Sequence, residues 1–256
     1  RICISMVTHG RSYRDTLDIT RRITGQVATP LSILVAPPTL DREKLARFKE
    51  AGVDMIGIGL DAVTKDLFRE LRTDVPQGGL RWDKYWEIVG HARDLFGPWK
   101  VNCHTLVGIG ETDRDLAAIF AQLRDREIFS YLFSFNPEPD SRLGRTPRAS
   151  QTRWRRVQLL KHLIETERMD PALCRFDDAG GLAGIGLSLE RLREEAWTGV
   201  PFMTNGCPGP NGEPGCTRPY GSYRPSEPFR DFPFLPIADD RHGILQELRL
   251  EELAER

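Results

Sequence analysis

The sequence predicts an α/β protein whose core is a parallel β-sheet. In the first half of the chain, short apolar runs alternate with segments of helical spacing, and the strand–helix order repeats five times. The apolar runs are nearly continuous, which is typical of strands covered on both faces. Strands joined by helices run parallel, with right-handed crossovers. We therefore expect either a β/α barrel or a doubly wound sheet.

The elements follow from these runs in order. The expected strands are 2–8, 30–37, 53–62, 100–110 and 128–139, and the expected helices are 13–26, 41–52, 64–73, 81–97 and 112–127. The helix at 41–52 opens with Asp41, a preferred N-cap residue, and closes with Gly52. A dinucleotide-binding fold would carry a G-x-G-x-x-G motif after its first strand, and "MVTHGR" has none. The barrel is therefore favoured.

After residue 149 the pattern changes. Long helical segments are expected at 150–168 and 187–199, with the Gly-rich stretch 174–186 between them. From Pro201 onward, proline and aromatic residues indicate an extended segment that lies across the barrel face, and a short charged helix is expected at 244–256. We predict two domains, a β/α barrel over 1–149 and a helical, loop-rich cap over 150–256.

Composition limits the functional classes. The chain has 256 residues and a net charge of −1, so no overall field attracts nucleic acid or an anionic membrane. No apolar run approaches about 18 residues, the length that spans a bilayer. The five cysteines are an odd number without a secretory signal, which favours a reducing compartment and a cytoplasmic protein. Arg1 leads directly into an apolar run, so we expect the true N-terminus to lie upstream.

Candidate site residues stand where the expected strands end, because reactive groups of β/α barrels gather at the carboxyl ends of the strands. Thr8 and His9 follow the first strand, although a lone histidine is more often structural. Asp61 ends "GIGLD" and has the carboxylate that a ribose diol needs. The alternative for Asp61 is a helix N-cap, a role that Thr64 could share.

The stretch "HTLVGIGET" is more informative. Gly108 and Gly110 would let the backbone approach a flat ligand closely. Glu111 could accept hydrogen bonds from backbone amides of the turn. The alternative for Glu111 is an ordinary acidic residue at a helix N-terminus.

Taken together, "ISMVTH", "GIGLDA" and "HTLVGIGET" resemble the radical S-adenosylmethionine (SAM) superfamily, on its biotin-synthase-like side. The resemblance covers roughly residues 1–145 and implies that Asp61 holds the SAM ribose. It further implies that Thr8 and His9 lie nearest the methionine amino group. The adenine-contacting positions that it implies are His104, Leu106, Gly108 and Glu111.

The chain departs from the superfamily in one respect. The C-x3-C-x2-C loop that binds a [4Fe–4S] cluster is absent from the sequence. In the superfamily this loop follows the first barrel strand, and this chain resembles the family from the second strand onward. We therefore expect a partial (β/α)6-type TIM-like barrel lacking its first strand, with cluster ligands outside this chain. Without them the chain should be inactive. The rival interpretation is a degenerate barrel that never held a cluster.

A second cysteine feature lies near the C-terminus. The segment "TNGCPGPNGEPGCTRPYGSYRP" resembles the C-terminal segment of the two-component lipoyl synthases, which implies an auxiliary iron–sulfur cluster that donates sulfur. Cys207 and Cys216 stand on a Gly/Pro loop that could wrap a cluster, and the resemblance places Cys3 with them as a further ligand. A zinc site and free thiols remain alternatives. Strand alternation turns Cys103 toward the helices, and nothing fixes a role for Cys174.

The resemblance implies a radical SAM enzyme that inserts sulfur into an unactivated C–H bond, in lipoyl synthesis. SAM would be cleaved reductively to a 5′-deoxyadenosyl radical that takes hydrogen from that carbon. The expected partners are an octanoylated carrier protein or peptide, a second radical SAM subunit and a reductant, without nucleic acid or membrane. Two other interpretations stay open: another biotin-synthase-like radical SAM enzyme (a mutase or lyase), and a non-radical β/α barrel that binds a nucleoside.

Overall fold

The computed structural model describes residues 1–72, 79–217 and 221–255. Two compact units share the chain. The first unit comprises residues 1–105, 125–131 and 206–216, and the second comprises 106–124, 132–205 and 217–256. The boundary that we expected after residue 149 stays a prediction. Among the described residues, no helix has the length and apolar character that crossing a membrane requires.

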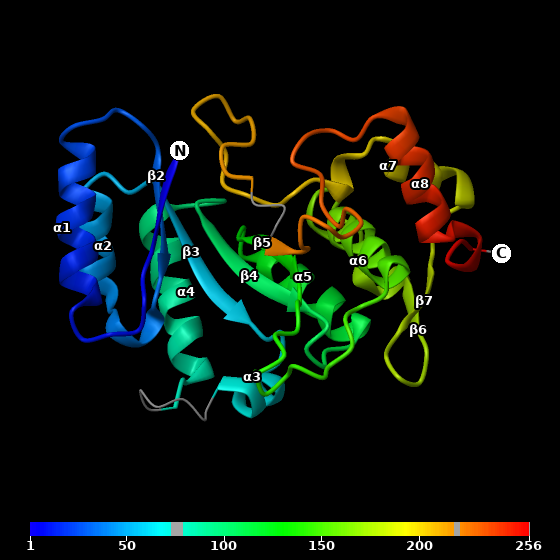
Figure 1. The fold of residues 1–256 in the computed structure, drawn as a ribbon, viewed down its shortest axis with the longest axis horizontal. Coiled ribbons are helices and arrows are strands. Elements are labelled where there is room, and N and C mark those ends of the chain that lie inside the picture. Colours follow the sequence, from blue (N-terminus) through cyan, green and yellow to red (C-terminus); the bar gives the residue numbers. More distant parts are fainter. Residues whose placement is uncertain (73–78, 218–220, 256) are drawn as a thin grey trace. The chain divides into compact units, whose positions relative to one another are not determined.

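A five-stranded sheet runs through the fold (Figure 1). Its order is β1-β2-β3-β4-β5, and the first three neighbouring pairs are parallel. The strands are β1 (Ile2–Ser5), β2 (Leu31–Val35), β3 (Met55–Asp61), β4 (Val101–Val107) and β5 (Phe129–Ser134). This order confirms the parallel α/β fold of a partial barrel, and within the described residues the sheet does not close. Strand β1 ends at Ser5, earlier than the expected Thr8.

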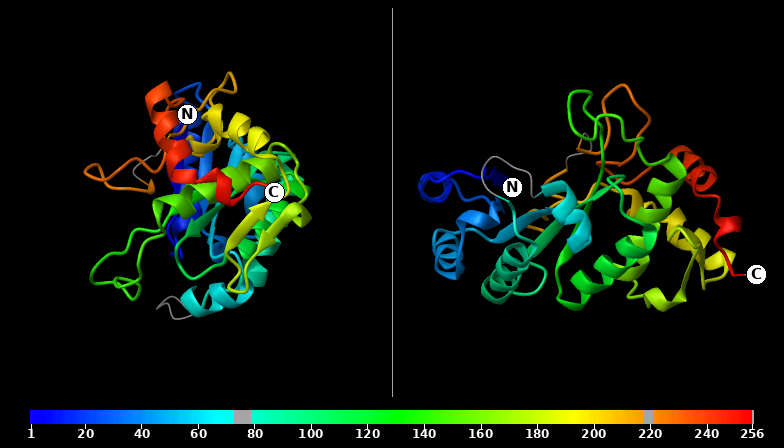
Figure 2. Two further views of the ribbon diagram at one scale, coloured as in Figure 1. Left: turned by 90° about the vertical axis from the view of Figure 1, so that its right-hand side faces the viewer. Right: turned by 90° about the horizontal axis from the view of Figure 1, so that it is seen from below.

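Four helices of the first unit connect these strands. They are α1 (Ser12–Thr24), α2 (Arg42–Glu50), α3 (Lys65–Arg72) and α4 (Trp82–Phe96), and residues 37–39 form a short 3-10 helix. Helix α2 packs between α1 and α4, as Figure 2 shows from below. Asp41 caps α2 as expected, since its Oδ1 accepts a hydrogen bond from the Lys44 amide at 2.9 Å. Thr64 similarly accepts from the Leu67 amide at 3.2 Å at the start of α3.

Alternation along the strands gives the sheet two different faces. Residues such as Ile33, Ile56, Ile58, Val101 and Cys103 share one face and are fully buried. Large buried side chains of the helices, including Phe48 of α2 and Ile88 of α4, belong to the same core. This face therefore supplies the hydrophobic core of the first unit.

The second unit is mainly helical. It contains α5 (Asp113–Asp125), α6 (Gln151–Glu165), α7 (Leu189–Trp197) and α8 (Ala238–Leu248), a hairpin of β6 (Cys174–Phe176) and β7 (Leu182–Ile185), and 3-10 turns at 171–173, 200–202 and 250–252.

One stretch of this unit had no predicted structure, and one expectation for the unit needs correction. The Gly-rich stretch 174–186 forms the antiparallel hairpin β6–β7, because Asp177 Oδ1 accepts from the Ala179 and Gly181 amides and closes a tight turn. The last helix starts at Ala238 rather than 244, where Asp240 accepts from the Ile237 amide at 3.2 Å.

A buried polar network lies along α6. Gln158 donates to Asp231 Oδ1 at 2.8 Å, and the neighbouring Arg155 and Arg230 are also buried. Burial raises the pKa of Asp231 to about 7, although a Ser222 hydrogen bond and the two guanidinium groups favour its charged form. This carboxyl is therefore a buried titratable group of the second unit.

Candidate functional site

The second face of the sheet in the first unit is polar rather than apolar. In the parallel register Cys3 pairs with Ser32, and Gly57 pairs with Asn102, so each pair points to one side. His104 follows Asn102 on the same side of β4. Leu34 and Met55 also lie on this face, but it carries more small and polar side chains than the opposite face. Such a face is suited to holding a ligand rather than to filling a core.

Cys207 lies against this polar face. Asn102 donates a hydrogen bond from Nδ2 to Cys207 Sγ at 3.5 Å, and the cysteine is buried. Burial raises the pKa of Cys207, whereas hydrogen bonds with Tyr131 and Ser32 and the charge of Arg1 lower it. Cys3 also acts electrostatically on Cys207. The structure therefore brings the predicted Cys3 and Cys207 to the same face.

A hairpin in residues 206–216 positions Cys207. The Gly215 amide donates to the Cys207 carbonyl at 3.2 Å, and an antiparallel bridge joins Pro208 to Pro214. Arg1 anchors the hairpin, since its Nε donates to the Pro208 carbonyl at 2.6 Å. Its two terminal nitrogens bind the carboxylate of Asp54, each at 2.7 Å. Sequence reasoning did not assign this positioning role to Arg1.

The predicted metal ligands are brought together only in part. Cys216 stands on the other arm of the hairpin and is half-buried. Among the described residues, Cys3, Cys207 and Cys216 do not form a three-ligand group, and no three cysteines do. Of the cysteines without a predicted ligand role, Cys103 is buried as expected, and burial raises its pKa to about 12. Burial raises the pKa of Cys174, in β6, to about 11.

Asp61 occupies the end of β3 in a left-handed conformation, with φ of 61°. Its Oδ2 forms an ion pair with Arg72, which also donates to the Gly59 carbonyl at 2.8 Å. Burial raises the pKa of Asp61, and the attraction of Arg72 opposes that rise. The capping alternative is not what the structure shows, because Thr64 caps α3. The contact between Asp61 and the SAM ribose, which the resemblance implies, stays a prediction.

His104 lies on the polar face, on the same side of β4 as Asn102. Its ring stacks on Tyr131 with centroids 6.0 Å apart. A Cβ atom at Gly57 would lie 3.6 Å from His104 Nε2 and only 3.0 Å from Asn102 Oδ1. Glycine at position 57 therefore keeps room above these two polar side chains. Leu106 is half-buried, two residues along β4 from His104.

The turn after β4 is built by Glu111. Its carboxylate accepts from the Gly108 amide at 2.8 Å and from the Ile109 amide at 2.9 Å, and Arg153 donates to it at 2.8 Å. This confirms the expected bonds to backbone amides. Gly108 and Gly110 adopt φ of 107° and 119°, which side-chain-bearing residues rarely adopt. The glycines are thus required by the turn itself. Whether the turn contacts adenine stays a prediction.

Thr8 and His9 are exposed at the loop between β1 and α1. His9 Nδ1 accepts from the Arg11 amide at 3.2 Å, and its carbonyl accepts from the Ser12 amide at 3.0 Å. These bonds connect His9 to the first turn of α1. They agree with a structural contribution, and a contact with the methionine group of SAM stays a prediction.

Comparisons with known proteins identify a matching family and a similar fold. The family model of the radical SAM superfamily matches residues 3–123, which contain strands β1 to β4 and the Gly108–Glu111 turn. No curated protein matches the chain in sequence. Among solved structures, the chain is similar to the crystal structure of methylornithine synthase (PylB). The TM-score is 0.51 at 11% identity, over 99% of this chain and 68% of that chain. At such an identity the likeness shows the fold alone.

Proposed function

We propose, from the match of residues 3–123 to the radical SAM superfamily, that this chain is a radical SAM enzyme whose reaction inserts sulfur into an unactivated C–H bond. The proposed substrate is an octanoyl chain on a lysine of a carrier protein or of a derived peptide. A second radical SAM subunit and a reductant would act with it.

The placement of Cys207 carries this proposal. A buried thiol lies against the polar face of the sheet, with Cys3 near enough to affect its pKa. Soft sulfur ligands select iron–sulfur clusters, and hydrogen bonds to the sulfurs tune such clusters. Asn102, Ser32 and Tyr131 provide such bonds at Cys207. These features support a role in sulfur chemistry beyond packing.

The fit to a complete auxiliary cluster is partial. Cys3 and Cys207 share the face, but the described residues add no third cysteine to them. The described cysteines also provide no three-thiolate set for the [4Fe–4S] cluster that the superfamily implies. We therefore assign no reaction step to either cluster. The 256-residue chain alone should produce no 5′-deoxyadenosine from SAM under dithionite, and its detection would contradict this ligand assignment.

The roles proposed for the binding residues concern SAM. In this superfamily, SAM supplies the agent that removes hydrogen from the substrate carbon. Asp61, held in place by Arg72, would accept hydrogen bonds from the ribose. The turn shaped by Glu111, together with His104 and Leu106, would contact adenine. Thr8 and His9 would contact the methionine amino group.

Iron loading tests the sulfur proposal. The full chain is reconstituted anaerobically with iron and sulfide, and bound iron and acid-labile sulfide are measured per chain. Cys207→Ser should lose the bound iron, because a hydroxyl is a poor substitute for a soft thiolate. Cys174→Ser, which changes a half-buried cysteine of the β6–β7 hairpin, is the matched control and should keep it.

Equal iron content in both variants and in the unmodified chain would end the sulfur-donor proposal. Failure of the unmodified chain to retain iron would end it as well. Another biotin-synthase-like activity, a mutase or a lyase, would then replace it. Retention of zinc in place of iron at Cys207 would identify a structural zinc site.

A further inference from the structure

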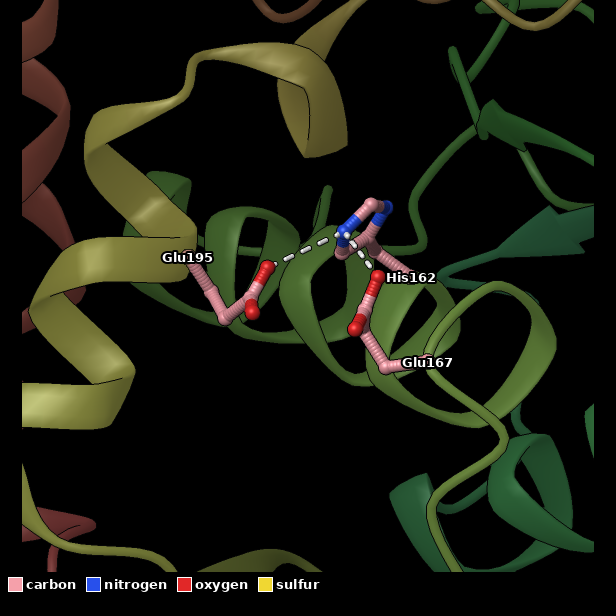
Figure 3. Close-up of side chains that lie close together, drawn as sticks. All are labelled: His162, Glu167 and Glu195. Carbon is pink, nitrogen blue, oxygen red and sulfur yellow. Dashed lines mark ion pairs between the residues drawn. The ribbon is translucent and has the colours of Figure 1, made fainter.

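The second unit contains three ligand-type side chains that the proposed function does not use. His162 lies in the last turn of α6, Glu167 follows that helix, and Glu195 lies on α7. One ligand atom from each lies within 4.8 Å of the other two. Figure 3 shows the imidazole of His162 facing both carboxylates.

The distances suit a shared ion better than direct hydrogen bonds. His162 Nε2 is 3.4 Å from Glu195 Oε2 and 3.9 Å from Glu167 Oε1. Both are longer than the usual N–H···O range of about 2.7–3.2 Å. Two ligands bound about 2.1 Å from a tetrahedral zinc ion lie about 3.4 Å apart. The separation of His162 and Glu195 equals the one that such an ion imposes, and the separation of His162 and Glu167, at 3.9 Å, is longer.

Arg191 contacts the oxygen of each carboxylate that does not face His162. Its guanidinium contacts Glu195 through Oε1 and Glu167 through Oε2, the latter at 3.5 Å. The oxygens that face His162 are the other ones, Glu195 Oε2 and Glu167 Oε1. Arg191 thus orients both carboxylates without occupying the space between them and the imidazole. Outer partners of this kind commonly orient metal ligands.

The charges around the group do not balance. Arg191 also lies 3.6 Å from Glu194, so one guanidinium faces three carboxylates. Lys161, the neighbouring cation on α6, is bound to Glu165 at 2.7 Å. Glu194 and Glu167 are exposed to solvent, whereas Glu195 is buried and has Arg191 as its charged partner on Oε1, which leaves Oε2 facing His162.

We propose that His162 Nε2, Glu167 Oε1 and Glu195 Oε2 form a divalent-cation site, with Zn²⁺ as the ion that the ligand set fits best. One nitrogen and two carboxylate oxygens are ligands that zinc accepts. Glu167 is the exposed member, so water can complete the coordination on its side. The ion would tie the end of α6 to α7 and so stabilise the second unit.

Metal titration tests this site. Metal-depleted full-length chain is titrated with Co²⁺, and with Zn²⁺ in parallel, and affinity is measured by calorimetry and by absorption. Cobalt bound to nitrogen and oxygen shows visible bands without the intense near-ultraviolet band of thiolate ligation, which separates this site from the five cysteines. His162→Gln and Glu195→Gln should each weaken this binding by at least about a hundredfold, since loss of outer partners alone costs roughly 10–100-fold.

Glu194→Gln is the matched control, because Glu194 also faces Arg191 but not His162. It should bind the metal as the unmodified chain does. Should His162→Gln fail to fold, Glu195→Gln and the melting temperature decide, since Zn²⁺ should raise the melting temperature of the unmodified chain and of Glu194→Gln. Unchanged affinity in both ligand variants, a spectrum with thiolate ligation only, or no rise in melting temperature would overturn the proposal.

Discussion

Replacement of Glu111 by alanine should markedly destabilise the turn after β4. The side chain is completely buried, and its carboxylate accepts from the Gly108 and Ile109 amides and from Arg153. Arg153 keeps a second partner in the variant, because its Nε donates to Asp113 at 2.8 Å. The two backbone amides, by contrast, lose the acceptor that this turn provides.

The magnitude follows from these bonds. Hydrogen bonds to a charged group contribute about 1.5–3 kcal/mol each, so losing two should cost about 3–6 kcal/mol. Breaking one partner of a buried ion pair costs a similar amount, about 3–5 kcal/mol. Glu111→Gln keeps one acceptor oxygen and should cost about half as much.

Two measurements check this expectation. Denaturant titration gives the change in the free energy of unfolding, and hydrogen exchange reports the Gly108 and Ile109 amides directly. Both amides should lose protection in Glu111→Ala. Glu43→Ala is the control, since Glu43 is exposed on α2 and should change stability by no more than about 0.5 kcal/mol. A cost for Glu111→Ala below about 1 kcal/mol, with both amides still protected, would refute the assigned role.

Three further predictions concern single residues. Asp61→Ala should weaken SAM binding by about 1.5–3 kcal/mol in calorimetry, and unchanged affinity would leave Asp61 only as the partner of Arg72. Because burial raises the pKa of Cys103 to about 12, a thiol reagent at pH 8 should modify the exposed Cys3 and leave Cys103 intact in the native chain; early labelling of Cys103 would contradict its placement. Burial raises the pKa of Asp231 from 3.8 to about 7, so the native state keeps a proton that the unfolded chain releases between these values. Stability should therefore fall as pH rises through that window, by roughly 4 kcal/mol at most, and Asp231→Asn should remove this dependence; parallel pH profiles for both proteins would refute it.

Local patterns in the sequence were enough to predict the strands and the side of β4 from which Cys103 projects. Alternation placed Cys103 in the core, and Asp41 marked the start of α2 correctly. The reason is that strand parity and helix capping depend on neighbouring residues only. The hairpin at 174–186 was not predicted, because the stretch was noted only as Gly-rich, whereas Asp177 closes a turn there.

The candidate site depends on contacts that no local pattern contains. Nothing in the sequence indicates that Arg1 binds Asp54 and the Pro208 carbonyl, or that Asn102 contacts Cys207. The facing of Glu195 on α7 and His162 on α6 is likewise set by tertiary packing. The motif "GIGET" did indicate the role of Glu111, because its bonds reach only two and three residues back along the chain.

The 206–216 hairpin also has a kinetic consequence. Its contacts with Arg1 and Asn102 join residues separated by 207 and 105 positions in the chain. Closing such long loops is slow, since the entropy must be lost before the contacts form. The hairpin should therefore dock after the strands of the first unit have formed. In the interval the side chain of Asn102 would stay open to solvent and small solutes until Cys207 contacts it.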